Sequence, residues 1–196
     1  MWKVNEIFHS LQGEGYNTGT ASVFIRLSGC NLRCAFCDTQ HESGTMMSLP
    51  QIVEQVMHYP LAPWIILTGG EPSLWIDEDF VKGLKMMTGK RIAIETNGTR
   101  PLPPGLDWVT LSPKGGIGGC PAVPVVLDHC DELKVVYLGQ DLSQYSDIKA
   151  THRYLQPCWT DDKTTCSRNL QATVQAVMDN PQWRLSLQTH RILGIK

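Results

Sequence analysis

Three cysteines lie close together in the segment GCNLRCAFCDTQ, at the spacing C-x3-C-x2-C. They are Cys30, Cys34 and Cys37. Three thiolates at short spacing favour a soft metal ion or an iron–sulfur cluster. A closed structural site takes four protein ligands, whereas a site that does chemistry keeps one coordination position open. The motif is therefore either an incomplete structural site or an open, reactive one.

The motif leaves three kinds of site to weigh. A structural zinc site would need a fourth ligand, and His41 follows Cys37 four residues later. An electron-transfer ferredoxin site would need four cysteines. A [4Fe–4S] cluster with three protein ligands would leave one iron free to bind another molecule. On the spacing of the cysteines alone, a zinc site is a less favoured alternative to a [4Fe–4S] cluster with three protein ligands.

Composition indicates an ordinary soluble domain that acts on a small molecule. The 196 residues predict a single domain over 1–196, and the 42% hydrophobic content fits a well-packed core. A net charge of −2 disfavours nucleic acid as a partner. The first residues show no apolar core of signal-peptide length, and the apolar runs are far shorter than the ~20 residues of a membrane span. We expect a cytoplasmic protein without a membrane partner.

Short apolar runs alternate with helical periods, which is typical of an α/β fold with a mostly parallel sheet. About six parallel strands are expected, fewer than a complete eightfold barrel has. We therefore predict an abbreviated, partly open parallel (β/α) barrel. Residues 157–169 are expected to form a variable loop, and the glycine-rich run 115–119 a flexible one. The expected strands are 22–27, WIILTGGEP (64–72, a strand that ends in a glycine turn), 91–95, DWVTLSPK (107–114, a strand and then a loop), 132–138, 153–157 and 183–190. The expected helices are 49–59 (capped by Ser48), 77–87 and 169–180.

Polar clusters follow the predicted strands. In parallel α/β folds the active site lies at the carboxyl ends of the strands. The clusters begin at Cys30 and continue at 68–71, 95–97, 112–114, Gln156 and 188–190. We expect them to form one site.

The cysteine motif and the turn Thr68-Gly69-Gly70-Glu71-Pro72 together resemble the radical S-adenosylmethionine enzymes. The resemblance implies a [4Fe–4S] cluster on Cys30, Cys34 and Cys37, which act as the catalytic and metal ligands. It also implies that the free iron binds S-adenosylmethionine, whose reductive cleavage yields a 5′-deoxyadenosyl radical. The positions that match cofactor contacts of that family are Phe36, Cys37, Asp38, Gly70, Glu71, Ser112, Pro113, Lys114 and Gln156.

The whole chain resembles the 7-carboxy-7-deazaguanine synthases more narrowly. The resemblance rests on LQGEG (11–15), Arg26, CDT (37–39), and the ETN, SPK, LQP and QTH segments. It implies conversion of 6-carboxy-5,6,7,8-tetrahydropterin to 7-carboxy-7-deazaguanine with loss of ammonia, on the route to queuosine. It further implies Mg²⁺ at Thr39, a homodimer, and an electron donor such as flavodoxin. The implied substrate contacts are Leu11, Gln12, Gly13, Glu14, Arg26, Thr68, Glu95, His190 and Lys196.

The residue types suit such a substrate. The donor edge of a pterin requires an acceptor such as Glu95, and its carboxylate requires a cation such as Arg26, with His190 beside it. Each residue also has a structural alternative: Arg26 a salt bridge at a strand end, and Glu95 a buried lysine partner. Without the resemblance, Thr39 is more simply a hydroxyl that bonds to a turn.

Two rival functions share some of these features. An enzyme that installs a glycyl radical on a protein would have the cysteine motif and the glycine turn, but would not need LQGEG, Arg26 or Glu95. A zinc-stabilised binding module would use the cysteines without catalysis. The remaining cysteines match no ligand spacing, so buried thiols are favoured over an auxiliary metal site. They are Cys120, Cys130, Cys158 and Cys166.

Overall fold

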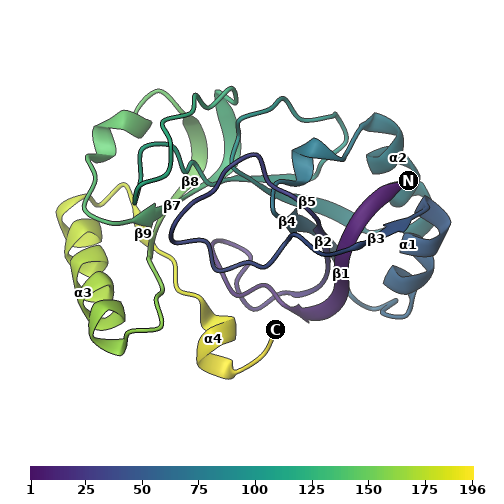
Figure 1. Cartoon of the computed structure of the whole chain (residues 1–196), viewed down its shortest axis with the longest axis horizontal. Coiled ribbons are helices and arrows are strands. Elements are labelled where there is room, and N and C mark those ends of the chain that lie inside the picture. The colour runs from purple at the N-terminus through teal and green to yellow at the C-terminus, as the bar shows by residue number, and fades with distance from the viewer.

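A computed structural model describes residues 1–196. One nine-stranded sheet runs in the order β3-β1-β2-β4-β5-β6-β7-β8-β9. Neighbours from β2 to β9 are parallel, while β1 pairs antiparallel with both β2 and β3. No pairing joins β9 to β3, so the sheet is an open partial barrel (Figure 1). The strands are β1 Trp2–Leu11, β2 Ala21–Leu27, β3 Thr45–Met47, β4 Trp64–Gly69, β5 Arg91–Thr96, β6 Trp108–Leu111, β7 His129–Tyr137, β8 Lys149–Pro157 and β9 Arg184–Leu185.

The predicted open parallel barrel is confirmed, with two strands added at its edge. The sequence prediction did not include β1 or β3. β1 nevertheless carries a partial alternation of apolar and polar residues in VNEIFHSL. It places LQGEG at its carboxyl end, and it covers the edge that β2 would otherwise expose to solvent.

Three of the four helices, α1, α2 and α3, begin where polar side chains cap them. The structure contains α1 Leu49–Met57, α2 Glu78–Thr88, α3 Lys163–Asp179 and α4 Thr189–Leu193, with short 3-10 turns η1 Pro72–Leu74 and η2 Leu142–Tyr145. The Gln51 side chain accepts the backbone N–H of Ser48 at 2.8 Å, before α1. Asp77 Oδ1 accepts the N–H of Phe80 at 2.8 Å, before α2. α1 and α2 lie at the β1 end of the sheet and α3 at the β9 end (Figure 1).

Two local predictions are wrong. The expected loop 157–169 contains the first turns of α3, because Asp162 caps this helix by accepting the N–H of Thr165 at 2.8 Å. The expected last strand, 183–190, is paired only over Arg184–Leu185. The chain turns away after Ser186 and forms α4, so that His190 lies on a helix.

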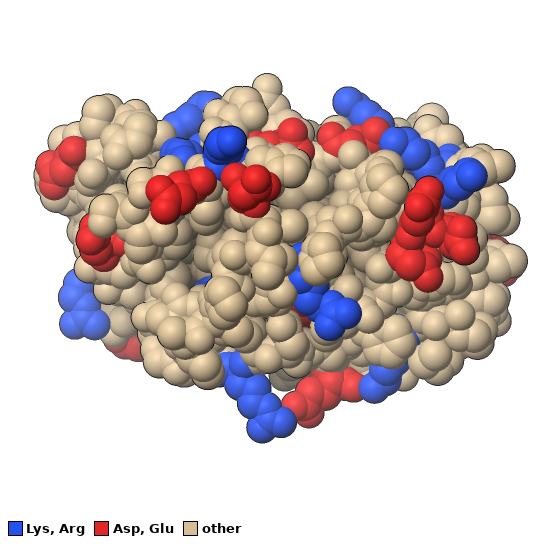
Figure 2. Space-filling model, turned by 90° about the horizontal axis from the view of Figure 1, so that it is seen from above, with Lys and Arg blue, Asp and Glu red and all other residues tan.

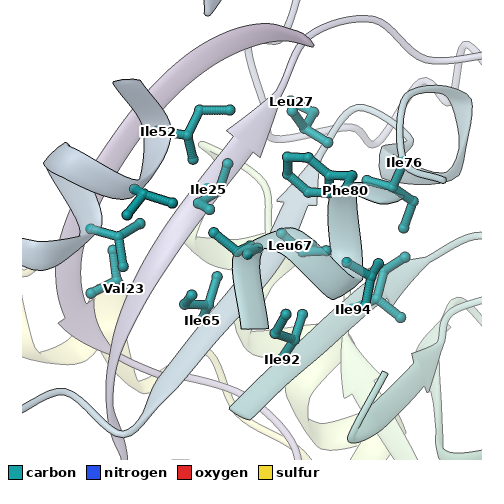
Figure 3. Packing of buried hydrophobic residues seen from close by; sticks show 14 of the residues in the cluster. Val23, Ile25, Leu27, Ile52, Ile65, Leu67, Ile76, Phe80, Ile92 and Ile94 are labelled. Carbon is teal, nitrogen blue, oxygen red and sulfur yellow. The ribbon is translucent and has the colours of Figure 1, made fainter. Parts of the chain in front are cut away.

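Alternation along each strand divides the side chains between two environments. On β2, Val23, Ile25 and Leu27 are fully buried under α1 and α2, and Figure 3 shows them packed with Ile52, Phe80 and residues of β4 and β5. Phe24 and Arg26 point to the opposite face, since successive side chains alternate. The same parity places Thr68, Glu95 and Lys134 on that inner face. Apolar burial on the outer face therefore fixes which polar groups point into the barrel.

A second core cluster supports the other half of the sheet. Leu111, Leu133, Val135 and Leu155 pack there with Trp183. No helix of the chain is long and apolar enough to cross a membrane. On the face seen in Figure 2, acidic and basic side chains are interspersed, without a continuous basic surface.

Candidate active site

A cavity of about 340 Å³ opens at the carboxyl ends of the parallel strands. Its wall includes side chains from β1 and β2 near one edge of the sheet, from β7 and β8 near the other, from the cysteine loop and from α4. Most residues that the sequence predicts as functional meet there. They are Leu11, Gln12, Gly13, Glu14, Arg26, Cys30, Cys34, Phe36, Cys37, Asp38, Thr39, Thr68, Gly70, Glu95, Ser112, Lys114, Gln156, His190 and Lys196. Glu71 and Pro113 are the two predicted residues outside the wall.

The cysteine loop follows β2 and is held by backbone hydrogen bonds. The N–H of Gly29 donates to the carbonyl of His41 at 2.7 Å, which closes the loop. Within it, the N–H of Cys37 donates to the carbonyl of Cys34 at 3.1 Å. Cys30, Cys34 and Cys37 are free thiols on the cavity wall. The loop therefore presents three soft ligands from one side of the cavity, as a cluster with three protein ligands requires.

Two glycines allow β4 to end directly against this loop. A Cβ atom on Gly69 would lie 2.0 Å from the carbonyl oxygen of Leu27, and one on Gly70 would lie 2.0 Å from that of Gly29. Only residues without a side chain permit this approach. The glycine turn thus brings a bare backbone segment beside Cys30, where a bound group can reach main-chain atoms.

The carboxylate of Glu71 is used within the fold. It accepts the N–H of Ser73 at 3.0 Å, the hydroxyl of Thr96 at 2.7 Å and the N–H of Asn97 at 2.7 Å. The side chain is 1% exposed and lies off the cavity wall. This geometry does not support the predicted direct cofactor contact of Glu71; instead the residue joins the ends of β4 and β5.

LQGEG is shaped by what packs against its glycines. A Cβ on Gly13 would lie 2.1 Å from Nδ1 of His190. Gly15 has φ +65°, and a Cβ there would lie 1.8 Å from Oε1 of Glu132. The absence of a side chain at Gly13 therefore lets α4 pack against this segment, and its absence at Gly15 lets β7 do so. Between them, Glu14 reaches the cavity.

A buried lysine forms the charged centre of the site. Lys134 Nζ lies 2.7 Å from Glu14 Oε2 and 2.8 Å from Glu95 Oε2, and its side chain is 4% exposed. Burial alone would lower the pKa of Lys134, but the attraction of Glu14, Glu95 and Glu132 outweighs burial and raises it. Burial likewise opposes ionisation of Glu14, yet the charge of Lys134 lowers the pKa of Glu14 to about 2. Gln12 Nε2 donates to the other oxygen of Glu95 at 3.1 Å.

The sequence prediction did not name Lys134, although a signal was present. In DELKVVY a glutamate and a lysine occupy alternate positions of an otherwise apolar strand, so both face the same side. The structural alternative considered for Glu95, a buried lysine partner, is what the structure shows. Glu95 nevertheless remains on the cavity wall.

Glu132 is a third carboxylate beside this lysine. It is 2% exposed; Oε2 accepts the N–H of Tyr16 at 3.0 Å, and Oε1 has no hydrogen-bond partner. Burial raises the pKa of Glu132 to about 7; Lys134 lowers it, while Glu95 and Glu14 add to the rise. Glu132 therefore keeps its proton to a higher pH than an ordinary glutamate does.

A basic group lies at the β1–β2 edge of the cavity. Arg26 Nε lies 2.9 Å from Glu6 Oε1, so the strand-end salt bridge considered as its alternative is present. Lys196 also pairs with Glu6. Phe8 and Phe24 stack with ring centroids 5.0 Å apart, and Arg26 lies over the Phe8 ring at 5.7 Å. The edge thus presents stacked aromatic rings and two cations.

The C-terminal helix is tied to the cysteine loop. Arg191 Nη2 lies 2.6 Å from Asp38 Oδ2, and Gln188 Nε2 donates to Glu14 Oε1 at 2.8 Å. The Thr39 hydroxyl lies 3.3 Å from Asp38 Oδ1. Arg191 was not predicted; a cation next to His190 in QTHR was the available signal. Burial lowers the pKa of His190, so its imidazole is neutral at neutral pH.

Comparisons with known proteins decide the family. The Radical SAM superfamily model matches residues 24–117. A 7-carboxy-7-deazaguanine synthase from Bacteroides thetaiotaomicron is 55% identical over 196 residues, covering 100% of both chains. This chain belongs to the same family. A 7-carboxy-7-deazaguanine synthase from Bordetella pertussis is 37% identical over 217 residues, covering 99% of each chain. The crystal structure of QueE from Escherichia coli superposes with a TM-score of 0.74 at 27% identity, covering 95% of this chain and 93% of that one.

Membership of the 7-carboxy-7-deazaguanine synthase family confirms the predicted resemblance and makes the chain a radical S-adenosylmethionine lyase. Its cofactors are a [4Fe–4S] cluster and S-adenosylmethionine, and it acts on a small molecule with an external reductant. The three thiols beside the glycine turn fit this pair of cofactors. Membership of this family sets the alternative zinc site aside.

Proposed function

We propose that this chain converts 6-carboxy-5,6,7,8-tetrahydropterin to 7-carboxy-7-deazaguanine with release of ammonia; the names of its relatives give the product. One observation carries the proposal beyond the family name. The buried Lys134 and the partly buried Glu14 and Glu95 that pair with it share a single cavity with the cysteine loop. A polar heterocycle can therefore bind within reach of the radical chemistry.

Glu95 is the proposed acceptor for the donor edge of the pterin. Its two oxygens already accept one bond each, from Gln12 and from Lys134. A carboxylate can accept about four hydrogen bonds, so capacity remains for substrate N–H groups. Glu14, Glu95 and Lys134 together carry a net negative charge, which favours a donor-rich edge. Leu11, Gln12, Gly13, Glu14 and Thr68 would complete the wall around this edge.

Arg26 is the proposed partner of the substrate carboxylate. Only its Nε is engaged by Glu6, so the two terminal nitrogens remain able to donate in a bidentate pair. His190 and Lys196 lie on the same cavity wall and would add donors. The carboxylate would thereby be held at the end of the cavity opposite the acidic cluster.

For the cofactors, we propose that Cys30, Cys34 and Cys37 hold the cluster. When bound, the cluster and S-adenosylmethionine supply the radical that removes hydrogen from the carboxylate-bearing ring carbon. The chain's own part is to orient the molecules and exclude water. The proposed cofactor contacts are Phe36, Asp38, Gly70, Ser112, Lys114 and Gln156. Glu71 would act by holding the turn, and Pro113 by shaping the loop that bears Ser112 and Lys114.

Further features of the proposal rest on the family. Mg²⁺ would bind at Thr39 with waters and substrate oxygens, since Mg²⁺ often keeps several waters, and Asp38 lies beside this hydroxyl. We propose a homodimer that receives electrons from a carrier such as flavodoxin. The free thiols fit a reducing cytoplasm, and one continuous sheet supports a single domain over 1–196.

An anaerobic assay tests the function. The reconstituted protein would receive S-adenosylmethionine, a reductant, Mg²⁺ and 6-carboxy-5,6,7,8-tetrahydropterin, with products identified by mass spectrometry. We expect 7-carboxy-7-deazaguanine and ammonia in equal amounts, because the proposed conversion loses only ammonia. Release of 5′-deoxyadenosine without the deazaguanine would reject the substrate while leaving the radical chemistry.

A further inference from the structure

The loop after β6 is a packed turn, contrary to the flexible loop expected from its glycines. The N–H of Gly116 donates to the carbonyl of Cys120 at 3.1 Å. The N–H of Cys120 donates to the carbonyl of Ile117 at 2.8 Å. Ile117 is 2% exposed and belongs to the second core cluster. These contacts fix the position of Cys120, whose side chain is 4% exposed.

This turn packs directly against the cysteine loop. Gly118 has φ +51°, and a Cβ there would lie 2.7 Å from Cδ1 of Phe36, so glycine is required on both grounds. Next to this contact, Cys120 Sγ lies 3.0 Å from Cys34 Sγ. A thiol outside the C-x3-C-x2-C motif is therefore in contact with one of its three ligands.

Cys120 is unsuited to be a further ligand of the cluster. Each cysteine ligand of a cubane binds a different iron, so two ligand sulfurs cannot be in direct contact. While iron holds Cys34, Cys120 is a neighbouring thiol. Once iron is lost, Cys34 is free to react with it.

We propose that Cys34 and Cys120 form a disulfide when oxidation removes the cluster, and that this reversible bond protects Cys34 until the cluster is rebuilt. The proposal rests on Cys34 being a cluster ligand. Closing the bond needs the sulfurs to move from 3.0 Å to about 2.05 Å, a shift of side chains rather than of the fold. Both residues lie in loops that packing already holds together.

The oxidant is a low-molecular-weight disulfide such as glutathione disulfide. Loss of iron leaves the partly exposed Cys34 sulfur as a thiolate, which attacks the oxidant, forms a mixed disulfide and releases one thiol. The Cys120 thiolate then attacks the Cys34 sulfur and releases the second thiol. The two cysteines lose two electrons and two protons in total, and one disulfide oxidant is reduced to two thiols. A dithiol reductant reverses both steps.

Peptide mapping of the wild-type protein tests the bond directly. Reconstituted protein, with its cluster verified by visible absorbance, would be divided. One half would stay anaerobic, and the other would receive air and glutathione disulfide until the absorbance is lost. Free thiols would be alkylated before digestion without reductant. We expect a Cys34–Cys120 peptide pair in the bleached sample and none in the loaded one. Disulfides only among Cys30, Cys34 and Cys37, with Cys120 alkylated, would overturn the proposal. Failure of the protein to take up any cluster would instead count against the cluster assignment.

Variants test the protective role. Cys120→Ser is compared with Cys130→Ser, which removes another buried cysteine that makes no thiol contact with the cysteine loop. After bleaching and reduction, wild type and Cys130→Ser should regain iron and sulfide, while Cys120→Ser should regain at least about fivefold less and show irreversibly oxidised Cys34. Equal recovery by all three proteins would refute protection.

Discussion

The buried Lys134 on β7 and the partly buried Glu95 on β5 form an ion pair over the intervening strand β6, with 2.8 Å between Nζ and Oε2. Glu14, from the loop after β1, closes the pair from the other side at 2.7 Å. Segments from the first, second and third quarters of the chain therefore meet at one ammonium group. This relationship links the LQGEG segment to the sheet and shapes the acidic end of the cavity.

Removing the lysine should destabilise the fold strongly. In Lys134→Met, Glu14 and Glu95 lose the charge that compensates their burial, and we expect a loss of about 3–5 kcal/mol in the free energy of unfolding. Urea unfolding of the protein measures it. Lys149→Met, at a largely exposed position on β8, is the matched control and should cost less than about 0.5 kcal/mol. A similarly small loss for Lys134→Met would contradict the structural role of the pair.

Replacing Glu95 should damage substrate binding and spare the cluster. Glu95→Gln keeps the shape but removes a charged acceptor, which is worth about 1.5–3 kcal/mol, or roughly ten- to hundredfold in kcat/KM. Iron and sulfide content should stay at the wild-type level, since no cysteine is touched. Steady-state kinetics with iron analysis checks both. An unchanged kcat/KM would remove Glu95 from the substrate site.

Replacing a cysteine ligand should remove the cluster itself, unlike replacing Glu95. Cys30→Ala, Cys34→Ala and Cys37→Ala each remove one of the three thiols, so we expect loss of the cluster and of S-adenosylmethionine cleavage. Cys130→Ala, at a buried position away from the cysteine loop, should keep both. The measurements are iron content, visible absorbance and 5′-deoxyadenosine release. Retained cleavage in any of the three variants would reject the cluster assignment.

Much of this architecture was accessible from the sequence because alternation is a local signal. In SVFIRL the alternation of side chains predicts a strand with one face in the core, whereas the continuous apolar run WIIL predicts a strand buried on both faces, and the structure follows both patterns. The cysteine motif and the glycine turn are likewise local, and they lie on one cavity as predicted. In parallel α/β folds the active site lies at the carboxyl ends of the strands, so the sequence predicts which distant segments meet there before any side-chain contact is known.

Other features depend on contacts that no local pattern carries. In the sequence, Glu71 cannot be told apart from a carboxylate that binds a ligand. The structure shows that its oxygens already accept hydrogen bonds from Ser73, Thr96 and Asn97. WRLSLQTH alternates like a strand, yet β8 pairs with only two of its residues, so the rest turns into α4. Tertiary pairing overrides local propensity in such short segments.

Glu132 should make stability fall as the pH rises toward neutrality. The pKa of its carboxyl is raised from 4.5 to about 7 in the fold. Between these values the folded chain keeps a proton that the unfolded chain has released, so a rise in pH favours unfolding. The contribution of Glu14, whose lowered pKa is about 2, has the opposite sign; it is complete above pH 4.5 and is lost as the pH falls toward 2.

The test compares wild type with Glu132→Gln. Between pH 5 and 7.5, wild type should lose up to about 3 kcal/mol relative to the variant, at about 1.4 kcal/mol per pKa unit. His190 titrates nearby with a lowered pKa, but it is present in both proteins and cancels in the difference. Denaturant unfolding at several pH values supplies the two curves. Parallel curves would show that Glu132 does not titrate in this range.

Gly13 and His190 should be energetically coupled. A Cβ on Gly13 would lie 2.1 Å from the imidazole Nδ1, so Gly13→Ala must displace the ring or α4. In a His190→Ala background that conflict disappears. We expect a coupling energy of about 1–3 kcal/mol from the double-mutant cycle, measured by unfolding. Additive effects of the two substitutions would contradict the packing of α4 on LQGEG.

The central claim is that the radical formed at the cysteine loop acts on a pterin held by the acidic and basic ends of the same cavity. The most direct measurement uses 6-carboxy-5,6,7,8-tetrahydropterin deuterated at the carboxylate-bearing ring carbon. Under anaerobic turnover, mass spectrometry should find deuterium in 5′-deoxyadenosine while 7-carboxy-7-deazaguanine forms. Unlabelled 5′-deoxyadenosine, released without the deazaguanine from cluster-loaded protein, would contradict the account.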